Sequence, residues 1–252
     1  MSRAYYNAAQ SALRSASKHI LQNMDRIDRV RFTPDPDNDE QVSSVALAVE
    51  REIAERIQTL YPSHSLLCKH AGHIRAEIDD PSEQYHWVLD PLDGATNFIS
   101  GIPYFCISLA LFHNRRCVLA LVYQPVSDEL FSASIGESAL LNGKKLRARK
   151  AAYQTQSLVM LAGQTPVNEM VSELETLSKH ELTTSNIRLI GSVGLGLCYH
   201  AMGACDVFFA QNISICEAAA GLLIASEAGT IIKKSQKSDH TIDRVISLIT
   251  TS

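Results

Sequence analysis

The spacing of hydrophobic and polar residues in the first part of the chain predicts two helices followed by several strands. Apolar residues recur at helical spacing over residues 5–24 and again over residues 44–60, which predicts two amphipathic helices. The strand-like segments that follow are 65–68, 85–89, 104–112, 116–123 and 129–134. Short turns join the last three segments, and this order is typical of an antiparallel meander.

The second part of the chain alternates between strand and helix patterns. Strands are predicted at residues 158–161, 187–190, 206–210 and 230–233, and helices at 167–179, 193–202 and 216–228. Such alternation is typical of an α/β unit. The sequence therefore predicts an α+β part over residues 1–150 and an α/β part over residues 151–252, together forming one compact unit.

The composition is that of an ordinary globular protein. The chain has 252 residues, of which 46% are hydrophobic and 20% charged, and its formal net charge is -4. With no excess of basic residues, we expect no direct binding to nucleic acid or to a membrane. No signal-peptide pattern opens the chain, and no apolar run approaches the about 20 residues of a membrane span, which predicts a cytoplasmic location. The six cysteines lack paired spacing, so we expect free thiols.

The segment WVLDPLDGATNF, residues Trp87–Phe98, carries the first candidate chemistry. A strand that ends in Asp-x-x-Asp-Gly can direct the carboxylates of Asp90 and Asp93 and a backbone carbonyl toward one point. Gly94 lets the chain pass close to a ligand, and its amide and that of Ala95 can face an anion. Hard oxygen ligands beside an anion site suit Mg²⁺ bridging a phosphate. The plainer interpretation is that the two aspartates only cap a turn.

Several motifs in the same order and spacing resemble the inositol monophosphatase family, in particular its bacterial SuhB-type branch. They are DPLDGATNF, then PVSDELFSASIGESALLNGKKL, then Gly191-Ser192, and finally CEAAAG at Cys216–Gly221. The resemblance implies a layered αβαβα sandwich of the inositol monophosphatase/fructose-1,6-bisphosphatase type. It also implies a Mg²⁺-dependent phosphomonoesterase, usually dimeric, that hydrolyses small phosphates such as inositol 1-phosphate.

The resemblance further implies roles for the residues that match the family's motifs. Metal-binding positions are taken by Asp90, the carbonyl oxygen of Leu92, Asp93 and Glu217, with Asp93 also counted as catalytic. Substrate-binding positions are taken by Gly94, Ala95, Asn97, Gly191 and Ser192.

Other positions depart from the family pattern. His70 replaces a glutamate that binds metal and activates the attacking water, and Ala95 replaces a threonine that bonds the same water. Ala46 replaces an aspartate, Ala210 replaces a glutamate that contacts the substrate, and Glu217 replaces an aspartate. Because losing a positioned general base costs about 10²–10⁴ in rate, the sequence predicts weak or lost phosphatase activity, with His70 as the substitute for the missing glutamate.

Two interpretations of the substituted site stay open. Lys69, which stands where the family has another glutamate, can pair with an aspartate of the acidic turn and replace a metal ion. Alternatively, His70 can ligate Zn²⁺ or Mn²⁺, with Cys68 and Cys216 nearby and Asp90 and Glu217 completing the site.

These interpretations support two functional hypotheses. The first is a divergent phosphomonoesterase that acts on a small phosphate ester. The second is a non-catalytic scaffold or regulatory protein. Relatives of the SuhB type are associated with transcription antitermination, so the resemblance makes a protein of the transcription machinery a candidate partner. In either case the resemblance implies a homodimer.

Overall fold

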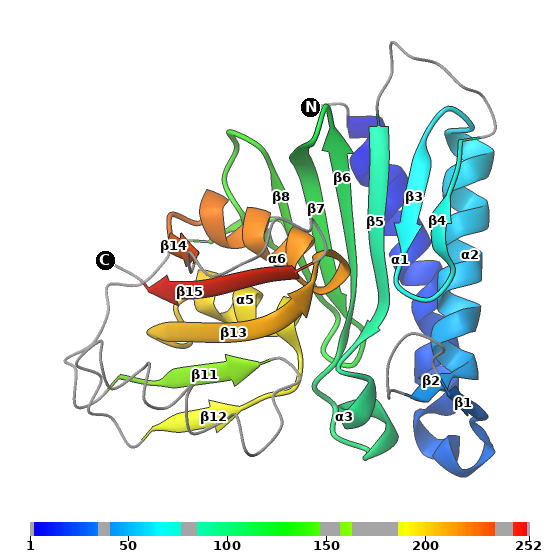
Figure 1. Ribbon diagram of the computed structural model, residues 1–252, viewed down its shortest axis with the longest axis horizontal. Coiled ribbons are helices and arrows are strands. Elements are labelled where there is room, and N and C mark those ends of the chain that lie inside the picture. Colours follow the sequence, from blue (N-terminus) through cyan, green and yellow to red (C-terminus); the bar gives the residue numbers. More distant parts are fainter. Residues whose placement is uncertain are drawn as a thin grey trace.

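The described residues form two large β-sheets, a small two-stranded sheet and two layers of helices (Figure 1). The computed structural model describes residues 3–34, 41–76, 85–146, 157–162, 186–234 and 244–250. The helices are α1 (Arg3–Asn23), η1 (Met24–Arg29, a 3-10 helix), α2 (Ser44–Leu60), α3 (Ala95–Ile99), α5 (Val193–Ala201) and α6 (Ile215–Glu227). The strands β1 (Phe32–Pro34) and β2 (Gln41–Ser43) form a small antiparallel pair.

The larger sheet has the strand order β10-β9-β8-β7-β6-β5-β3-β4. Its strands are β3 (Ser65–Cys68), β4 (Gly72–Ile74), β5 (Tyr85–Asp93), β6 (Cys106–His113), β7 (Arg116–Gln124), β8 (Glu129–Ser134), β9 (Leu140–Leu141) and β10 (Lys144–Lys145). Strands β5 to β8 pair antiparallel, as the predicted meander requires, whereas β3 and β5 are parallel.

The smaller sheet has the order β12-β11-β13-β15-β14. Its strands are β11 (Val159–Ala162), β12 (Ile187–Leu189), β13 (Val207–Ser214), β14 (Ile231–Lys234) and β15 (Arg244–Thr250). Strands β11, β12 and β13 are parallel, in agreement with the predicted α/β unit, and β15 adds an antiparallel strand between β13 and β14.

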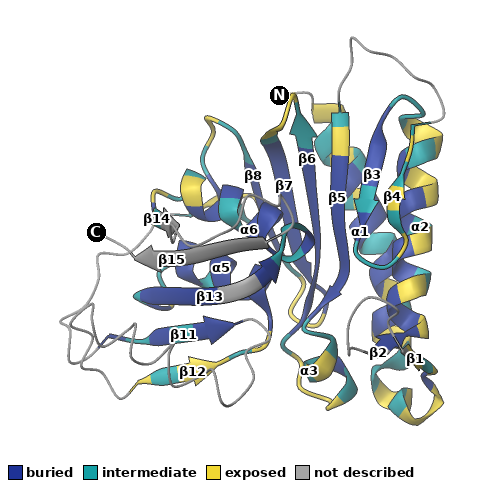
Figure 2. Ribbon diagram, viewed as in Figure 1, coloured by how far each residue is buried: buried dark blue, intermediate teal, exposed yellow. Residues whose placement is uncertain are grey.

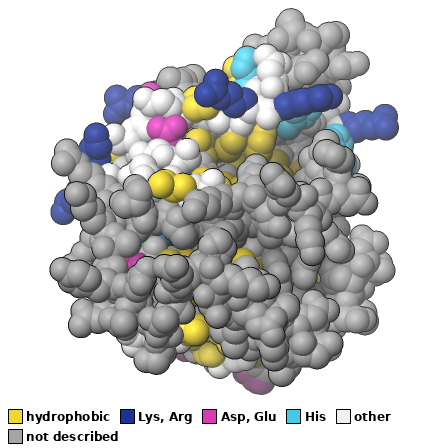
Figure 3. Space-filling view, turned by 60° about the vertical axis from the view of Figure 1, so that its left-hand side comes forward, with side chains coloured by type: hydrophobic (Ala, Val, Ile, Leu, Met, Phe, Trp, Pro, Cys, Tyr) yellow, Lys and Arg dark blue, Asp and Glu magenta, His cyan; other side chains and the backbone are white. Residues whose placement is uncertain are grey.

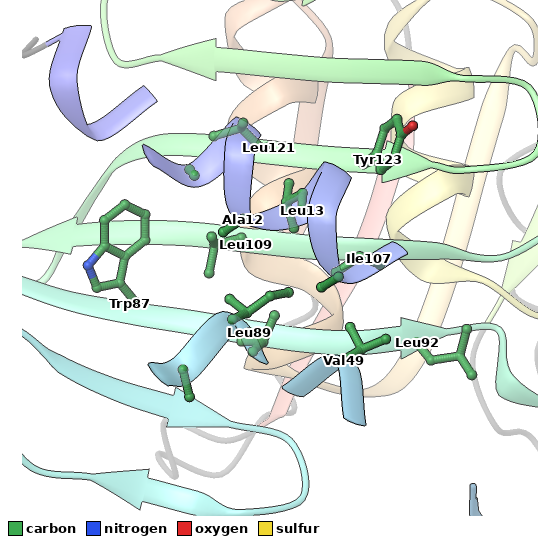
Figure 4. Packing of buried hydrophobic residues seen from close by; sticks show 14 of the residues in the cluster. Ala12, Leu13, Val49, Trp87, Leu89, Leu92, Ile107, Leu109, Leu121 and Tyr123 are labelled. Carbon is green, nitrogen blue, oxygen red and sulfur yellow. The ribbon is translucent and has the colours of Figure 1, made fainter. Parts of the chain in front are cut away.

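Helices α1 and α2 cover one face of the larger sheet, and α5 and α6 cover the other. Because successive side chains of a strand point to opposite faces, Trp87 and Leu89 of β5 pack with α1 and α2, while Val88 packs with α5 and α6. Figure 4 shows the first of these cores, with Leu13 of α1 and Val49 of α2 over the sheet. In Figure 2, α2 is buried along this side and exposed along the other.

Helices α5 and α6 lie between the two sheets, so they are apolar on nearly every side. Their packing is close: a Cβ added to Gly221 of α6 would lie 2.6 Å from Leu197 of α5. Likewise, a Cβ on Gly196 would lie 2.2 Å from the ring of Phe208 in β13. These two helices therefore join the sheets into one continuous interior.

The layered sandwich expected from the sequence is confirmed. The predicted helix at 167–179 lies outside the described residues, as do residues 147–156, so the division of the chain near residue 150 stays a prediction. Strand β5 runs four residues beyond the predicted end at Leu89, with an irregular register between Asp90 and Asp93. The acidic residues are therefore part of the strand's bulged end.

On one face of the described part, basic side chains gather at one edge. Figure 3 shows Lys, Arg and His side chains gathered along the upper part of the face it displays, above a strip of hydrophobic side chains. Arg115 in the turn between β6 and β7 is exposed, and so are Arg116 at the start of β7 and His86 of β5. None of the described helices is long and apolar enough to cross a bilayer.

Candidate functional site

The acidic turn lies at the end of β5, deep inside the protein. Asp90 is 0% and Asp93 3% exposed. The backbone amide of Leu92 donates a hydrogen bond of 3.1 Å to Asp90 Oδ1, which holds that carboxylate within the bulge. Gly94 follows with φ of +88°, and a Cβ there would lie 2.9 Å from the carbonyl oxygen of Tyr104. The close approach predicted at Gly94 is thus made by the protein's own backbone.

Lys69 brings Asp90 and Glu217 together. Its Nζ lies 3.3 Å from Asp90 Oδ2 and 3.0 Å from Glu217 Oε1. Asp90 belongs to β5, Lys69 to the turn after β3 and Glu217 to the first turn of α6. The side chains of Lys69 and Glu217 are only 17% and 14% exposed. Of the pairings expected for Lys69, the structure thus has the one with Asp90 and adds Glu217.

Glu217 is fixed by the start of its helix. Ser214 and Glu217 form a capping box: the amide and hydroxyl of Ser214 donate to Glu217 Oε2 at 2.8 and 2.9 Å, and Ser214 Oγ accepts from the Glu217 amide. Burial alone would raise the pKa of Glu217, but the charge of Lys69 and the bonds from Ser214 outweigh burial and lower it. Glu217 is therefore a stable anion.

The pKa of Asp90 is shifted in the opposite direction to that of Glu217. Burial raises the pKa of Asp90 above its ordinary value, and the neighbouring Glu217 adds to the rise, although Lys69 acts to lower it. Without a cation beside it, Asp90 would be a charged group in a site that water does not reach, which is strongly unfavourable.

Asp93 is engaged by the start of α5. Its Oδ2 accepts hydrogen bonds from Ser192 Oγ at 2.7 Å and from the Gly194 amide at 2.6 Å, and its Oδ1 accepts from the Val193 amide at 3.2 Å. The thiol of Cys106 lies 3.5 Å from Oδ2. Burial, together with the negative charges of the site, raises the pKa of Asp93 to about 7. The carboxylate thus links the larger sheet to the helix layer behind it.

Glu50 of α2 is a site residue that the sequence analysis missed. Its carboxylate accepts hydrogen bonds from the amides of His70 at 3.0 Å and Ala71 at 2.8 Å, and so holds the turn that carries Lys69. It is 3% exposed and lies within the apolar stripe of α2, next to Val49. A charged residue inside an otherwise apolar helix stripe is a signal that could have identified it.

The predicted substrate positions converge at the start of α5 and at α3. Asn97 Nδ2 donates to the carbonyl oxygens of Tyr104 and Ile190, both at 2.8 Å, and a Cβ on Gly191 would lie 3.2 Å from the same nitrogen. Ser192 caps α5 and bonds Asp93, and Ala95 begins α3. The structure brings these residues together through protein contacts, and their substrate roles stay predictions.

Two of the substituted positions, Ala46 and Ala210, carry only a methyl side chain. Ala46 lies in the first turn of α2, where its amide donates to Ser43 Oγ, and Ala210 is buried in β13. Burial raises the pKa of the Cys68 thiol to about 12 and that of Cys216 further, so both thiols are protonated near neutral pH.

The residues present do not fit the divalent metal that the fold family implies. Among the described residues, no group of three or more His, Cys, Asp and Glu side chains is arranged to hold a metal ion. The point between Asp90 and Glu217 is taken by the ammonium of Lys69, and Asp93 is engaged by α5. As arranged, the single positive charge of Lys69 lies between the carboxylates of Asp90 and Glu217 and offsets part of their negative charge.

Comparison with known proteins identifies the family. The family model described as the inositol monophosphatase family matches residues 1–249. The chain belongs to the inositol monophosphatase family. The Nus factor SuhB of Escherichia coli K12 is 33% identical over 227 residues, covering 90% of this chain and 83% of the relative. That of Pseudomonas aeruginosa is 31% identical over 242 residues, covering 94% and 88%.

Solved structures of inositol monophosphatase family members share the fold. A SuhB structure from Bartonella henselae has a TM-score of 0.86 at 26% identity and covers 99% of this chain and 94% of that one. An inositol monophosphatase from Anabaena has a TM-score of 0.79 at 24% identity, covering 99% and 91%, which shows the fold alone. This family member thus shares the fold of these structures, and in its described part Lys69 lies between Asp90 and Glu217.

Proposed function

We propose that this protein is a member of the inositol monophosphatase family that does not carry out metal-dependent phosphomonoester hydrolysis and acts instead as a non-catalytic partner protein. The observation that carries the proposal is the position of Lys69 Nζ, 3.3 Å from Asp90 and 3.0 Å from Glu217. A divalent cation at this point would be repelled by the ammonium, and at ~4 Å such a repulsion amounts to several kcal/mol even at an effective dielectric of about 20.

The remaining groups of the site support the same proposal. Metal-assisted hydrolysis needs a cation to polarise the phosphate and a base to activate water. Here Asp93 and Glu50 are both held by protein hydrogen-bond donors, and Ala95 has no hydroxyl to orient a water.

The names of the relatives support a role in transcription for the proposed non-catalytic protein. Several relatives at 31–33% identity are named Nus factors. We therefore propose a protein of the transcription machinery as the partner, in a process such as antitermination, with the protein itself forming a homodimer. A fold can host unrelated functions, so this part of the proposal needs its own test.

A hydrolysis assay tests the first part. The purified protein is given Mg²⁺ or Mn²⁺ and inositol 1-phosphate, sugar phosphates and nucleoside monophosphates, and phosphate release is measured. The comparison is a variant that restores the family's residues, with Ala46→Asp, Lys69→Glu, His70→Glu, Ala95→Thr and Ala210→Glu. We expect release above background only from the variant. Metal-dependent hydrolysis by the natural protein at the variant's rate would refute the proposal.

A binding assay tests the second part. The protein is mixed with RNA polymerase and purified transcription elongation factors of its own organism, and complexes are separated by size-exclusion chromatography with light scattering. We expect a stable complex that forms equally well with and without a chelator. If no complex forms with any of these components, the transcription role is wrong, whereas the loss of hydrolysis is judged by the first assay.

A further inference from the structure

We infer that the ammonium group of Lys69 takes the place of a bound divalent cation, and that removing its charge uncovers a metal site made by Asp90 and Glu217. The inference rests on the proposed function, because it explains how the fold has become independent of metal. It goes further in assigning this protein a latent metal site, closed by a single side chain.

The two carboxylates are brought together from distant parts of the chain. Asp90 belongs to the larger sheet and Glu217 to the helix layer behind it, and Lys69 and Glu217 are separated by 148 residues in sequence. With Asp90 at 0% and Glu217 at 14% exposure, neither charge is well solvated. Two such anions require a cation between them, and in this chain Lys69 supplies it.

Each carboxylate is oriented so that one oxygen is held by the protein and the other faces the cation. Asp90 Oδ1 accepts from the Leu92 amide, which leaves Oδ2 facing Lys69. Glu217 Oε2 accepts from Ser214, which leaves Oε1 facing Lys69. The contacts that fix these orientations do not involve Lys69, so they remain when its charge is removed.

The exposed pair of oxygens matches the chemistry of a hard divalent cation. Carboxylate oxygens are the preferred ligands of Mg²⁺ and Mn²⁺, and such ions commonly bind through a few carboxylates and complete their shells with water. Once the ammonium is gone, the same point has two oriented carboxylate oxygens, and His70, which also acts on Asp90, is the neighbouring described group that can carry a positive charge. In the natural protein that position is taken, so its stability does not depend on divalent cations.

The test compares Lys69→Met, which removes the charge and keeps an unbranched side chain, with Lys69→Arg, which keeps the charge. Lys18→Met, at an exposed position of α1, controls for the substitution itself. Each protein is stripped with a chelator and dialysed, and its thermal unfolding is followed from 0 to 10 mM Mn²⁺ and Mg²⁺. Isothermal titration with Mn²⁺ provides an independent measure of binding.

We expect Lys69→Met to have a lower Tm without metal and to gain roughly 3–10 °C in a saturable manner with Mn²⁺. The natural protein, Lys69→Arg and Lys18→Met should show no saturable response. Adding Glu217→Gln to Lys69→Met should remove the response, because one ligand is lost. If Lys69→Met is unfolded without metal, Mn²⁺ should restore its far-ultraviolet circular dichroism and a cooperative transition.

A Lys69→Met protein that neither binds Mn²⁺ nor is stabilised or refolded by it would overturn the inference. A saturable response of the natural protein would do so as well. The proposed function fails by a different result, hydrolysis by the natural protein. If hydrolysis is absent and Lys69→Met ignores metal, only the inference is wrong. If hydrolysis is present and only Lys69→Met responds to metal, only the proposed function is wrong.

Discussion

The carboxylate of Asp93 connects the end of β5 to the start of α5, and replacing it tests whether an acidic-turn residue serves the fold. Its two oxygens accept three hydrogen bonds, from Ser192 Oγ at 2.7 Å, the Gly194 amide at 2.6 Å and the Val193 amide at 3.2 Å. Hydrogen bonds to charged groups contribute about 1.5–3 kcal/mol each, and a buried donor left without an acceptor costs about 1–3 kcal/mol. Asp93→Asn turns an amide NH₂ toward at least one of these donors, so we expect the free energy of unfolding to fall by about 2–3 kcal/mol.

A second substitution isolates the side-chain part of this contact. Ser192→Ala removes one donor to Asp93 and also the cap of α5, since Ser192 Oγ accepts from the Leu195 amide at 3.4 Å. Losing the cap costs about 0.5–2 kcal/mol. Because both substitutions disturb the same hydrogen bond, the double variant should be more stable than the sum of the single effects predicts, by about 1–2 kcal/mol.

Urea unfolding in buffer with a chelator measures these free energies of unfolding. Ser100→Ala, at an exposed position, is the control and should change stability by no more than about 0.5 kcal/mol. If Asp93→Asn is as stable as the natural protein without metal, or if the two effects are additive within about 0.5 kcal/mol, the carboxylate does not hold α5. In that case Asp93 would be better interpreted as a ligand site than as a structural contact.

Three further predictions concern packing, the Lys69 turn and pH. Gly196→Ala should lower the free energy of unfolding by about 1–2 kcal/mol, because the added Cβ would lie 2.2 Å from the Phe208 ring and this overpacking exceeds the gain in helix propensity. Adding Phe208→Leu should recover part of the loss, and an unchanged Tm of Gly196→Ala would contradict the packing. Glu50→Gln should lower the free energy of unfolding, measured with urea, by about 1–3 kcal/mol, because the NH₂ group of the new glutamine would face a backbone amide donor. No loss would mean that Glu50 does not hold the turn. Burial, together with the charge of His86, lowers the pKa of His64 from 6.5 to about 4. The free energy of unfolding that neutral His64 supports is therefore complete above pH 6.5 and falls by up to about 3 kcal/mol as pH drops toward 4. His64→Gln should flatten this decline in urea unfolding at a series of pH values, and an equal slope in both proteins would refute the assignment.

The fold could largely be predicted from the sequence because its elements follow simple periodicities. The α1 and α2 stripes and the three meander strands have apolar patterns that burial against one layer requires, and their predicted bounds differ from the structure by a few residues at most. Strand β5 was predicted too short, because a strand pattern of apolar residues stops where Asp90 begins. The bulge that carries the acidic residues depends on how β5 pairs with β6. The local spacing of apolar residues gives no information about this pairing.

The site could be predicted only in part, because its contacts join residues far apart in the chain. The sequence indicated that Lys69 pairs with an acid of the turn, but it did not indicate Glu217, which is 148 residues away. Nor did it indicate that Asp93 bonds Ser192, 99 residues away. Such contacts depend on how α5 and α6 pack between the two sheets, so residue types at matching positions could not reveal them.

These contacts explain why an intact family motif does not by itself indicate an intact reaction. In this chain Asp93 bonds the start of α5, and Asp90 bonds the Leu92 amide and balances Lys69. Replacing either one would therefore cost stability whether or not a metal ever binds. Positions such as Ala46 and Ala95 make no such contacts through their side chains, so nothing in the fold requires the larger polar residues there. On the proposed function, the motif persists through these structural contacts even though Ala46 and Ala95 lack polar side chains.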